Sequence, residues 1–126
     1  MIRFISLTCI ALCATACSFH ARSAEDYRKV TRELVETRNA EVKACYDAAL
    51  KESPKVQGTV IVNFKVQSET GKITGATMDE VASSAPASLG ECIVKSLDGL
   101  VLDPPDARDG QATFQWSFEV GPAPAG

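Results

Sequence analysis

The fold of this chain is set by residues 58–66, which read GTVIVNFKV. Every second position is apolar and most positions between are polar, a period of two that is typical of a β-strand with one buried face. The apolar positions are Val60, Val62, Phe64 and Val66, and the polar ones are Thr59, Asn63, Lys65 and Gln67. This stretch therefore predicts a strand that packs one face against a core.

Two further strands are predicted on the C-terminal side. Residues 68–72 read SETGK, a turn in which Gly71 can take a positive φ, and residues 73–78 return as the second strand of a hairpin. Gly75 predicts a bulge or a weak point in that strand. Residues 114–120 alternate large apolar and polar side chains and predict the last strand.

Helical periodicity covers residues 25–52, before the hairpin. Apolar residues recur at i, i+3, i+4 and i+7 from Val42 onward, which indicates an amphipathic helix. The phase slips near Asn39, a good N-cap residue, so the segment allows one bent helix or two helices. Pro54 predicts that the helix ends near Glu52 or Ser53.

A shorter helix is predicted between the hairpin and the last strand. Residues 83–86 read SSAP, which favours a helix start with a serine cap, and Gly99 predicts the end of the helix. Helix, hairpin, helix and strand thus follow one another. This order predicts an α+β fold, a three-stranded antiparallel sheet with two helices on one face (α-β-β-α-β).

The N-terminus has the features of a secretory signal. Arg3 supplies a positive charge, and residues 4–14 form an uncharged run of about 11 residues, shorter than the roughly 20 that span a bilayer. Residues 14–17 read ATAC, which fits either ordinary cleavage before Cys17 or a bacterial lipobox in which Cys17 is acylated. By resemblance to lipoprotein sorting, Ser18 favours the outer membrane. We expect a lipoprotein facing the periplasm; the alternative is a soluble periplasmic or secreted protein.

The length of 126 residues allows one folded domain. We predict a signal peptide over residues 1–16, a lipidated cysteine and short tether over 17–25, the domain over 26–120 and an unstructured tail over 121–126.

Removing Arg3 with the signal leaves 12 Lys and Arg against 16 Asp and Glu, a net charge of −4. A weakly acidic domain is a poor candidate for binding nucleic acid.

Cysteine usage agrees with export. Of the five cysteines, Cys9 and Cys13 leave with the signal, and acylation of Cys17 leaves the pair Cys45 and Cys92. These two lie on the apolar stripes of the two predicted helices, which cover the same sheet face, so we predict a disulfide. It would close a loop of about 48 residues, worth up to roughly 4 kcal/mol. The alternative, a redox-active pair, lacks a C-x-x-C spacing.

The domain offers little for catalysis. Its only histidine is His20, in the tether, so a Ser–His or Cys–His relay is not expected. Asp103, Asp106 and Asp109 are spaced i, i+3, i+6, which is not the spacing of a calcium loop, and we interpret them as a solvated loop. Trp116 shares a face with Phe114 and is interpreted as core. We predict no catalytic residues, no metal site and no cofactor.

An ordered set of motifs resembles a known family. The motifs are Cys45-Tyr46, Pro54, the alternating strand from Gly58, Gly71, Cys92-Ile93, Pro104-Pro105 and Phe114-x-Trp116-x-Phe118. Over residues 41–120 this set resembles the TonB C-terminal domain, and more closely its AgmX/PglI-type relatives. The departures are an aliphatic stretch at residues 100–102, where the family commonly has an aromatic, and no uncleaved anchor or long Pro-rich arm, so energy transduction is not expected.

The resemblance implies a way of binding, in which an extended peptide adds to the edge of the sheet at the last strand. The main-chain groups that would bind it belong to Thr113, Phe114, Gln115, Trp116, Ser117, Phe118, Glu119 and Val120. We therefore expect a non-catalytic adaptor in the cell envelope that binds a peptide or protein, with the membrane reached through the lipid. The alternatives are a thiol-redox protein that uses Cys45 and Cys92, and a structural lipoprotein without a strand-adding partner.

Overall fold

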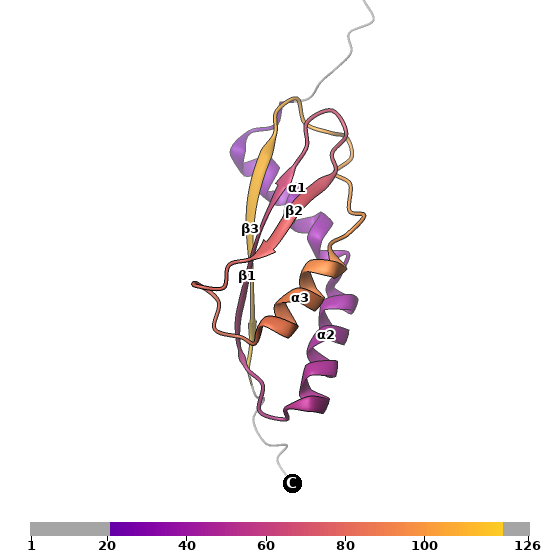
Figure 1. Cartoon of the computed structure of the whole chain (residues 1–126). Helices are drawn as coiled ribbons and strands as arrows, with labels where there is room; N and C mark the ends of the chain where they lie inside the picture. The colour runs from indigo at the N-terminus through magenta and orange to yellow at the C-terminus, as the bar shows by residue number, and fades with distance from the viewer. Residues whose placement is uncertain (1–20, 120–126) are drawn as a thin grey trace, which may run out of the picture.

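The computed structural model of the chain describes residues 21–119. The predicted signal peptide, the lipid site Cys17, Val120 and the predicted tail lie outside these residues. The described elements are, in order, α1 (Ala24–Glu36), α2 (Asn39–Glu52), β1 (Gly58–Val66), β2 (Ile73–Met78), α3 (Ala87–Ser96) and β3 (Gly110–Phe118) (Figure 1).

The three strands form one antiparallel sheet in the order β2-β1-β3, which confirms the predicted α+β class and sheet. β1 is central because both of its edges are paired. Its side chains alternate as predicted: Val60 and Val62 are fully buried on one face, while Asn63 and Lys65 are exposed on the other. β3 pairs with β1 over nine residues without interruption, with Trp116 opposite Val60 and Phe114 opposite Val62.

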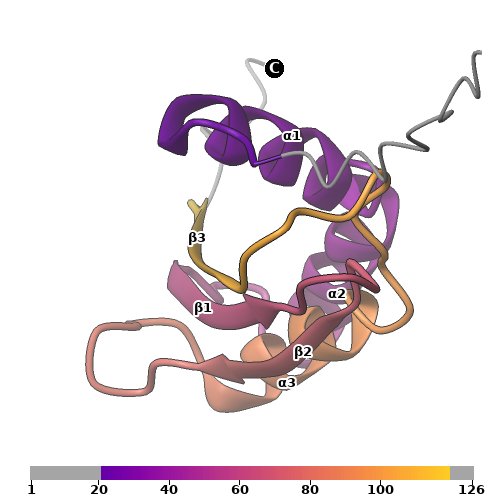
Figure 2. The same cartoon turned by 90° about the horizontal axis from the view of Figure 1, so that it is seen from above.

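Residues 21–119 contain three helices, so the segment that the sequence allowed as one bent helix or two holds two. The break between α1 and α2 falls at Thr37 and Arg38, within the segment where the sequence left one helix or two open. Arg38 leaves helical geometry with φ −101° and ψ 10°, and the Thr37 hydroxyl donates to the Leu34 carbonyl oxygen at the end of α1. Because of this bend, α1 and α2 point in different directions. α2 and α3 cover one face of the sheet, whereas α1 lies beyond β3, at the side away from β2 (Figure 2).

The β1–β2 hairpin has the predicted bounds and the predicted irregularity. Gly75 has a φ of 62°, a value that side chains with a Cβ rarely adopt. The pairing register shifts between Asn63 and Lys65, which lie opposite this part of β2. β2 is therefore bulged in its middle.

The predicted serine cap of the second helix is also wrong. α3 begins after Pro86, which makes no side-chain capping bond. Instead the Ser84 hydroxyl oxygen accepts from the backbone N–H of Thr59, and the Ser83 hydroxyl oxygen accepts from that of Ile61, each at 2.9 Å. The serines thus occupy the side of β1 that β2 is too short to cover.

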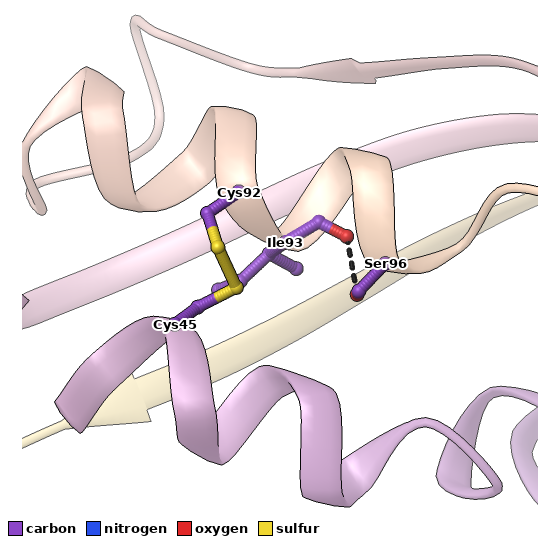
Figure 3. Close-up of a disulfide and its surroundings, with 4 residues drawn as sticks. All are labelled: Cys45, Cys92, Ile93 and Ser96. Carbon is purple, nitrogen blue, oxygen red and sulfur yellow. Dashed lines mark hydrogen bonds between the residues drawn. A yellow bond between two sulfur atoms is a disulfide. The ribbon is translucent and has the colours of Figure 1, made fainter. Parts of the chain in front are cut away.

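The predicted disulfide is confirmed. Cys45 of α2 and Cys92 of α3 are joined, with their Cα atoms 5.8 Å apart (Figure 3). The bond lies at the edge of the core, since Cys45 is buried and Cys92 is half-buried. Beneath it, Leu89 and Ile93 of α3, with Leu97 at its C-cap, pack on the apolar face of β1. The disulfide therefore fixes α2 and α3 to each other above the sheet.

Candidate functional site

The free edge of β3 is the most distinctive feature of the sheet. On β1, the N–H groups of Thr59 and Ile61 bond to Ser84 and Ser83, so the backbone groups of these residues point away from β3. Backbone groups in a strand alternate between its two edges, so Val60 and Val62 bond toward β3. Since Val60 lies opposite Trp116, the even-numbered residues of β3 bond to β1.

The odd-numbered residues of β3 consequently direct their N–H and C=O groups outward. These are Gln111, Thr113, Gln115 and Ser117. No described residue makes a backbone hydrogen bond to them across this edge. The same four side chains are exposed on the polar face of the sheet. An extended segment lying beside β3 would meet a row of unused donors and acceptors.

Of the eight residues predicted to bind at this edge, only some direct their backbone groups outward. Thr113, Gln115 and Ser117 point outward, whereas the backbones of Phe114, Trp116 and Phe118 are used by β1. Glu119 follows the strand, and its carbonyl oxygen accepts from the Tyr46 hydroxyl at 3.2 Å. Val120 lies outside the described residues.

Gln111 belongs to this edge, although the sequence did not predict it there. The strand begins at Gly110, four residues before the predicted start, because Gly110 and Ala112 lack the large apolar side chains that make the later alternation visible. The small Ala112 nevertheless continues that alternation.

The opposite edge of the sheet, along β2, is obstructed. Besides the bulge at Gly75, the loop before Leu102 runs along the start of this strand. The Ile73 N–H donates to the Leu100 carbonyl oxygen at 3.1 Å, and the Leu102 N–H donates to that of Gly71 at 2.7 Å. A bulge and a covering loop are ways in which proteins protect a strand edge from pairing. In residues 21–119 β3 has no bulge and no covering loop, and the helix beside it, α1, is separated from the edge by a groove.

A groove runs along the open edge, between β3 and α1. Its volume is about 820 Å³. One face of α1 forms a wall, since its lining residues recur at helical spacing: Ala24, Tyr27, Arg28, Thr31 and Arg32. Residues 110–115 of β3 form the other side, and residues 106–109 with Arg22 close one end.

At that end the structure corrects the interpretation of Asp106 as a solvated loop residue. Asp106 is only 3% exposed. Its carboxylate accepts from the backbone N–H groups of Arg22, at 2.9 Å, and Arg108, at 3.1 Å, and lies 3.6 Å from the Arg22 guanidinium. Burial alone would raise the pKa of Asp106, but the two N–H donors and both guanidinium groups outweigh it and hold the pKa below its usual value. Residues 22–25, assigned to a tether from sequence, thus include folded structure.

The Asp109 carboxylate also makes a hydrogen bond within the domain. Its carboxylate accepts from the backbone N–H of Ser68 at 2.8 Å, and this hydrogen bond lowers the pKa of Asp109. The bond ties the β1–β2 turn to the loop before β3. Asp103, the third member of the spaced trio, is exposed. Among residues 21–119 no three His, Cys, Asp or Glu side chains gather as a metal site would require.

The Tyr27 side chain of α1 lies against Gly110 of β3. A Cβ atom added to Gly110 would overlap the Tyr27 hydroxyl and ring, so a larger residue there would have to displace the Tyr27 side chain. Burial, followed by the nearby Asp106 carboxylate, raises the pKa of Tyr27, and the phenol therefore stays neutral at pH 7. Its hydroxyl and the Arg22 Nη1 atom are buried in the groove wall without a hydrogen-bond partner in the described chain.

Aromatic stacking holds β3 in place from its buried face. The Tyr46 and Phe118 rings stack at 4.7 Å, and the Phe64 and Phe114 rings at 5.7 Å, between centroids. Trp116 is half-buried and packs against the core, next to Phe114. The edge is thus presented by a strand that is anchored on its other side.

In comparisons with known protein families, curated proteins and solved structures, nothing matches this chain. The resemblance to the TonB C-terminal domain therefore stays a prediction. None of the helices in residues 21–119 has the length and apolarity needed to cross a bilayer.

Proposed function

We propose that this protein is a non-catalytic binding module that takes up an extended peptide segment by strand addition at the free edge of β3. The observation that carries the proposal is the row of outward-directed backbone groups at Gln111, Thr113, Gln115 and Ser117, set beside a groove. Peptides that add to a sheet obtain affinity from such main-chain bonds, and specificity from the side-chain contacts around them.

The position of the groove supports this function. It has a volume of about 820 Å³ and is lined by Gln111, Thr113 and Gln115, three of the residues whose backbone groups point outward. The strand is also rigid before binding, because it is paired with β1 along its whole length and stacked on the core. A preformed edge reduces the ordering cost of binding to that of the peptide alone.

The proposed setting is the bacterial cell envelope. It rests on the secretory features of the N-terminus, on the lipobox-like residues before Cys17 and on the disulfide between Cys45 and Cys92, a bond typical of oxidising compartments. The TonB-like order of motifs agrees with strand addition but names no partner. We propose an envelope-anchored adaptor whose partner is a peptide or protein of that compartment.

Proline substitution at the edge tests strand addition. Thr113→Pro removes an outward N–H without removing a backbone bond to β1, whereas Thr113→Val keeps the N–H. Both variants lose the hydrogen bond that the Thr113 hydroxyl donates to Asn63 Oδ1 at 2.6 Å, so they differ from each other only in the backbone. In pull-downs from envelope extract, we expect the wild-type chain and Thr113→Val to retain the same partners and Thr113→Pro to lose them. Circular dichroism would verify that both variants are folded. Identical partner lists for all three proteins would refute strand addition at β3.

Hydrogen exchange provides a second readout with any partner so identified. The amides of Thr113 and Gln115 should exchange quickly in the free protein and become protected in the complex. Those of Phe114 and Trp116 should be protected in both, because they bond to β1. Protection elsewhere without protection at Thr113 would assign binding to another surface.

A further inference from the structure

We infer that the groove selects an acidic partner: an extended segment whose carboxylate side chains face α1. This inference rests on the proposed function and specifies the chemistry of its ligand. The groove is lined by four arginines, Arg22, Arg28, Arg32 and Arg108, against two acidic residues, Asp106 and Asp109. The whole chain has the opposite sign, with a formal net charge of −3, so the groove departs from its surroundings.

Neither acid in the groove is available to neutralise the outer arginines. Asp106 is buried and occupied by Arg22 and by two backbone N–H groups. Asp109 is bonded to the Ser68 N–H. All other acidic residues also lie within residues 21–119, yet none forms an ion pair with Arg28, Arg32 or Arg108. The exposed guanidinium groups of Arg28 and Arg32 are therefore free to meet a carboxylate from outside, while the charge of Arg108 already acts on Asp106.

Unused donors at the closed end of the groove point the same way. The Arg22 side chain is only 7% exposed, and its Nη1 atom, which lies 3.6 Å from Asp106 Oδ2, has no hydrogen-bond partner among residues 21–119. The Tyr27 hydroxyl beside it also lacks one. A buried polar group without a hydrogen bond costs free energy. Both atoms are buried, so a ligand acceptor would reach them, and recover that cost, only after a movement of the groove wall. Both groups can donate, and a carboxylate can only accept.

The geometry determines which ligand side chains meet the arginines. A Cβ on Gly110 would point at Tyr27, and residues 110, 112 and 114 share one face of β3, so α1 flanks the edge on the apolar face. A strand added at this edge would turn alternate side chains toward Arg28 and Arg32 of α1. Its other side chains would lie beside Thr113 and Gln115, on the polar face. The preferred ligand therefore carries acidic residues at alternate positions.

Three synthetic octapeptides of alternating composition test this inference: four Thr-Glu repeats, four Thr-Gln repeats and four Thr-Lys repeats, each labelled with a dye. Binding to the mature chain, with its disulfide intact and Cys17 replaced by Ala, is followed by fluorescence polarisation. We expect the Glu peptide to bind about tenfold more tightly than the Gln peptide, since two or three exposed ion pairs supply roughly that factor. The Lys peptide should bind most weakly. Added salt should weaken the Glu peptide and leave the Gln peptide unchanged.

Two double variants distinguish an effect of the positive charges in the groove from an effect of the net charge of the protein. Arg28→Gln with Arg32→Gln should reduce binding of the Glu peptide to the level of the Gln peptide. The matched control, Lys29→Gln with Lys51→Gln, removes the same charge from exposed residues that do not line the groove, and it should leave the preference intact. Equal binding of the Glu and Gln peptides, abolished by Thr113→Pro, would refute acidic selectivity while leaving strand addition standing.

Two other outcomes would also overturn the inference. If none of the peptides binds, while a partner from the envelope does so independently of Thr113, the proposed function fails together with the ligand chemistry. If anionic phosphatidylglycerol vesicles bind the chain that lacks the lipid site, and Arg28→Gln with Arg32→Gln removes this binding, the arginines serve the membrane surface instead.

Discussion

Asp106 is the residue on which the closed end of the groove depends. It holds Arg22, two residues before α1, to the loop that leads into β3, and the two residues are 84 positions apart in sequence. We expect Asp106→Asn to lower the free energy of unfolding by about 1–3 kcal/mol at pH 7, because the variant weakens hydrogen bonds to a buried anion. The matched control is Asp103→Asn, an exposed position in the same loop that should change little.

The pH dependence of this contribution has a defined sign. The folded pKa of Asp106 lies below its ordinary value of 3.8, so the stabilisation is present above pH 3.8 and is lost as the pH falls through the folded pKa. Urea unfolding at pH 7 and at pH 2.5 should therefore show a difference between wild type and Asp106→Asn that shrinks in acid. A difference of the same size at both pH values would contradict the assignment.

Tyr27 gives the opposite expectation. Its buried hydroxyl has no partner in the described chain, so Tyr27→Phe should leave stability unchanged or raise it by up to about 1 kcal/mol. Tyr46→Phe is the comparison, since that hydroxyl donates to the carbonyl oxygens of Val56 and Glu119 and its loss should destabilise by about 1 kcal/mol. Urea unfolding of the two variants measures both effects. A Tyr27→Phe variant as destabilised as Tyr46→Phe would indicate a bond that α1 makes through this hydroxyl.

At the scale of elements, local patterns were predictable and distant contacts were not. The hairpin could be placed because period-two alternation, the turn at Gly71 and the bulge at Gly75 are properties of neighbouring residues. The serines at 83 and 84 were misread as a helix cap because their partners are backbone groups of β1, more than twenty residues away. The burial of Asp106 was hidden for the same reason.

The disulfide is the element-scale feature with the largest expected effect. It joins α2 to α3 across 47 residues of sequence, and those residues include β1 and β2. Cys45→Ala combined with Cys92→Ala should lower the free energy of unfolding by about 2–4 kcal/mol, because the unfolded chain loses a constraint. Urea denaturation of this variant and of the oxidised wild type measures the difference. An unchanged midpoint would show that the helices need no covalent link and would revive the redox interpretation of the pair.

At the scale of the whole molecule, the candidate site lies at the end of the domain nearest to the predicted lipid. Four residues lie between Cys17 and Arg22, so their Cα atoms are five steps apart and can be separated by at most about 18 Å. An acylated Cys17 would keep the Arg22 end of the groove within that distance of the membrane. The module would then bind partners close to the membrane surface, whereas a secreted form would not be restricted in this way.

Acylation of Cys17 is therefore the prediction that decides where the module works. Several acyl chains hold a protein on a membrane far more firmly than a single chain. We expect mass spectrometry of the mature chain to find an acylated N-terminal Cys17, and we expect Cys17→Ala to move the protein from the membrane fraction to the soluble fraction. Cys13→Ala, within the predicted signal, is the matched control and should leave the fractionation unchanged. An unmodified mature N-terminus, with both proteins in the soluble fraction, would favour ordinary cleavage and would free the groove to meet partners anywhere in its compartment.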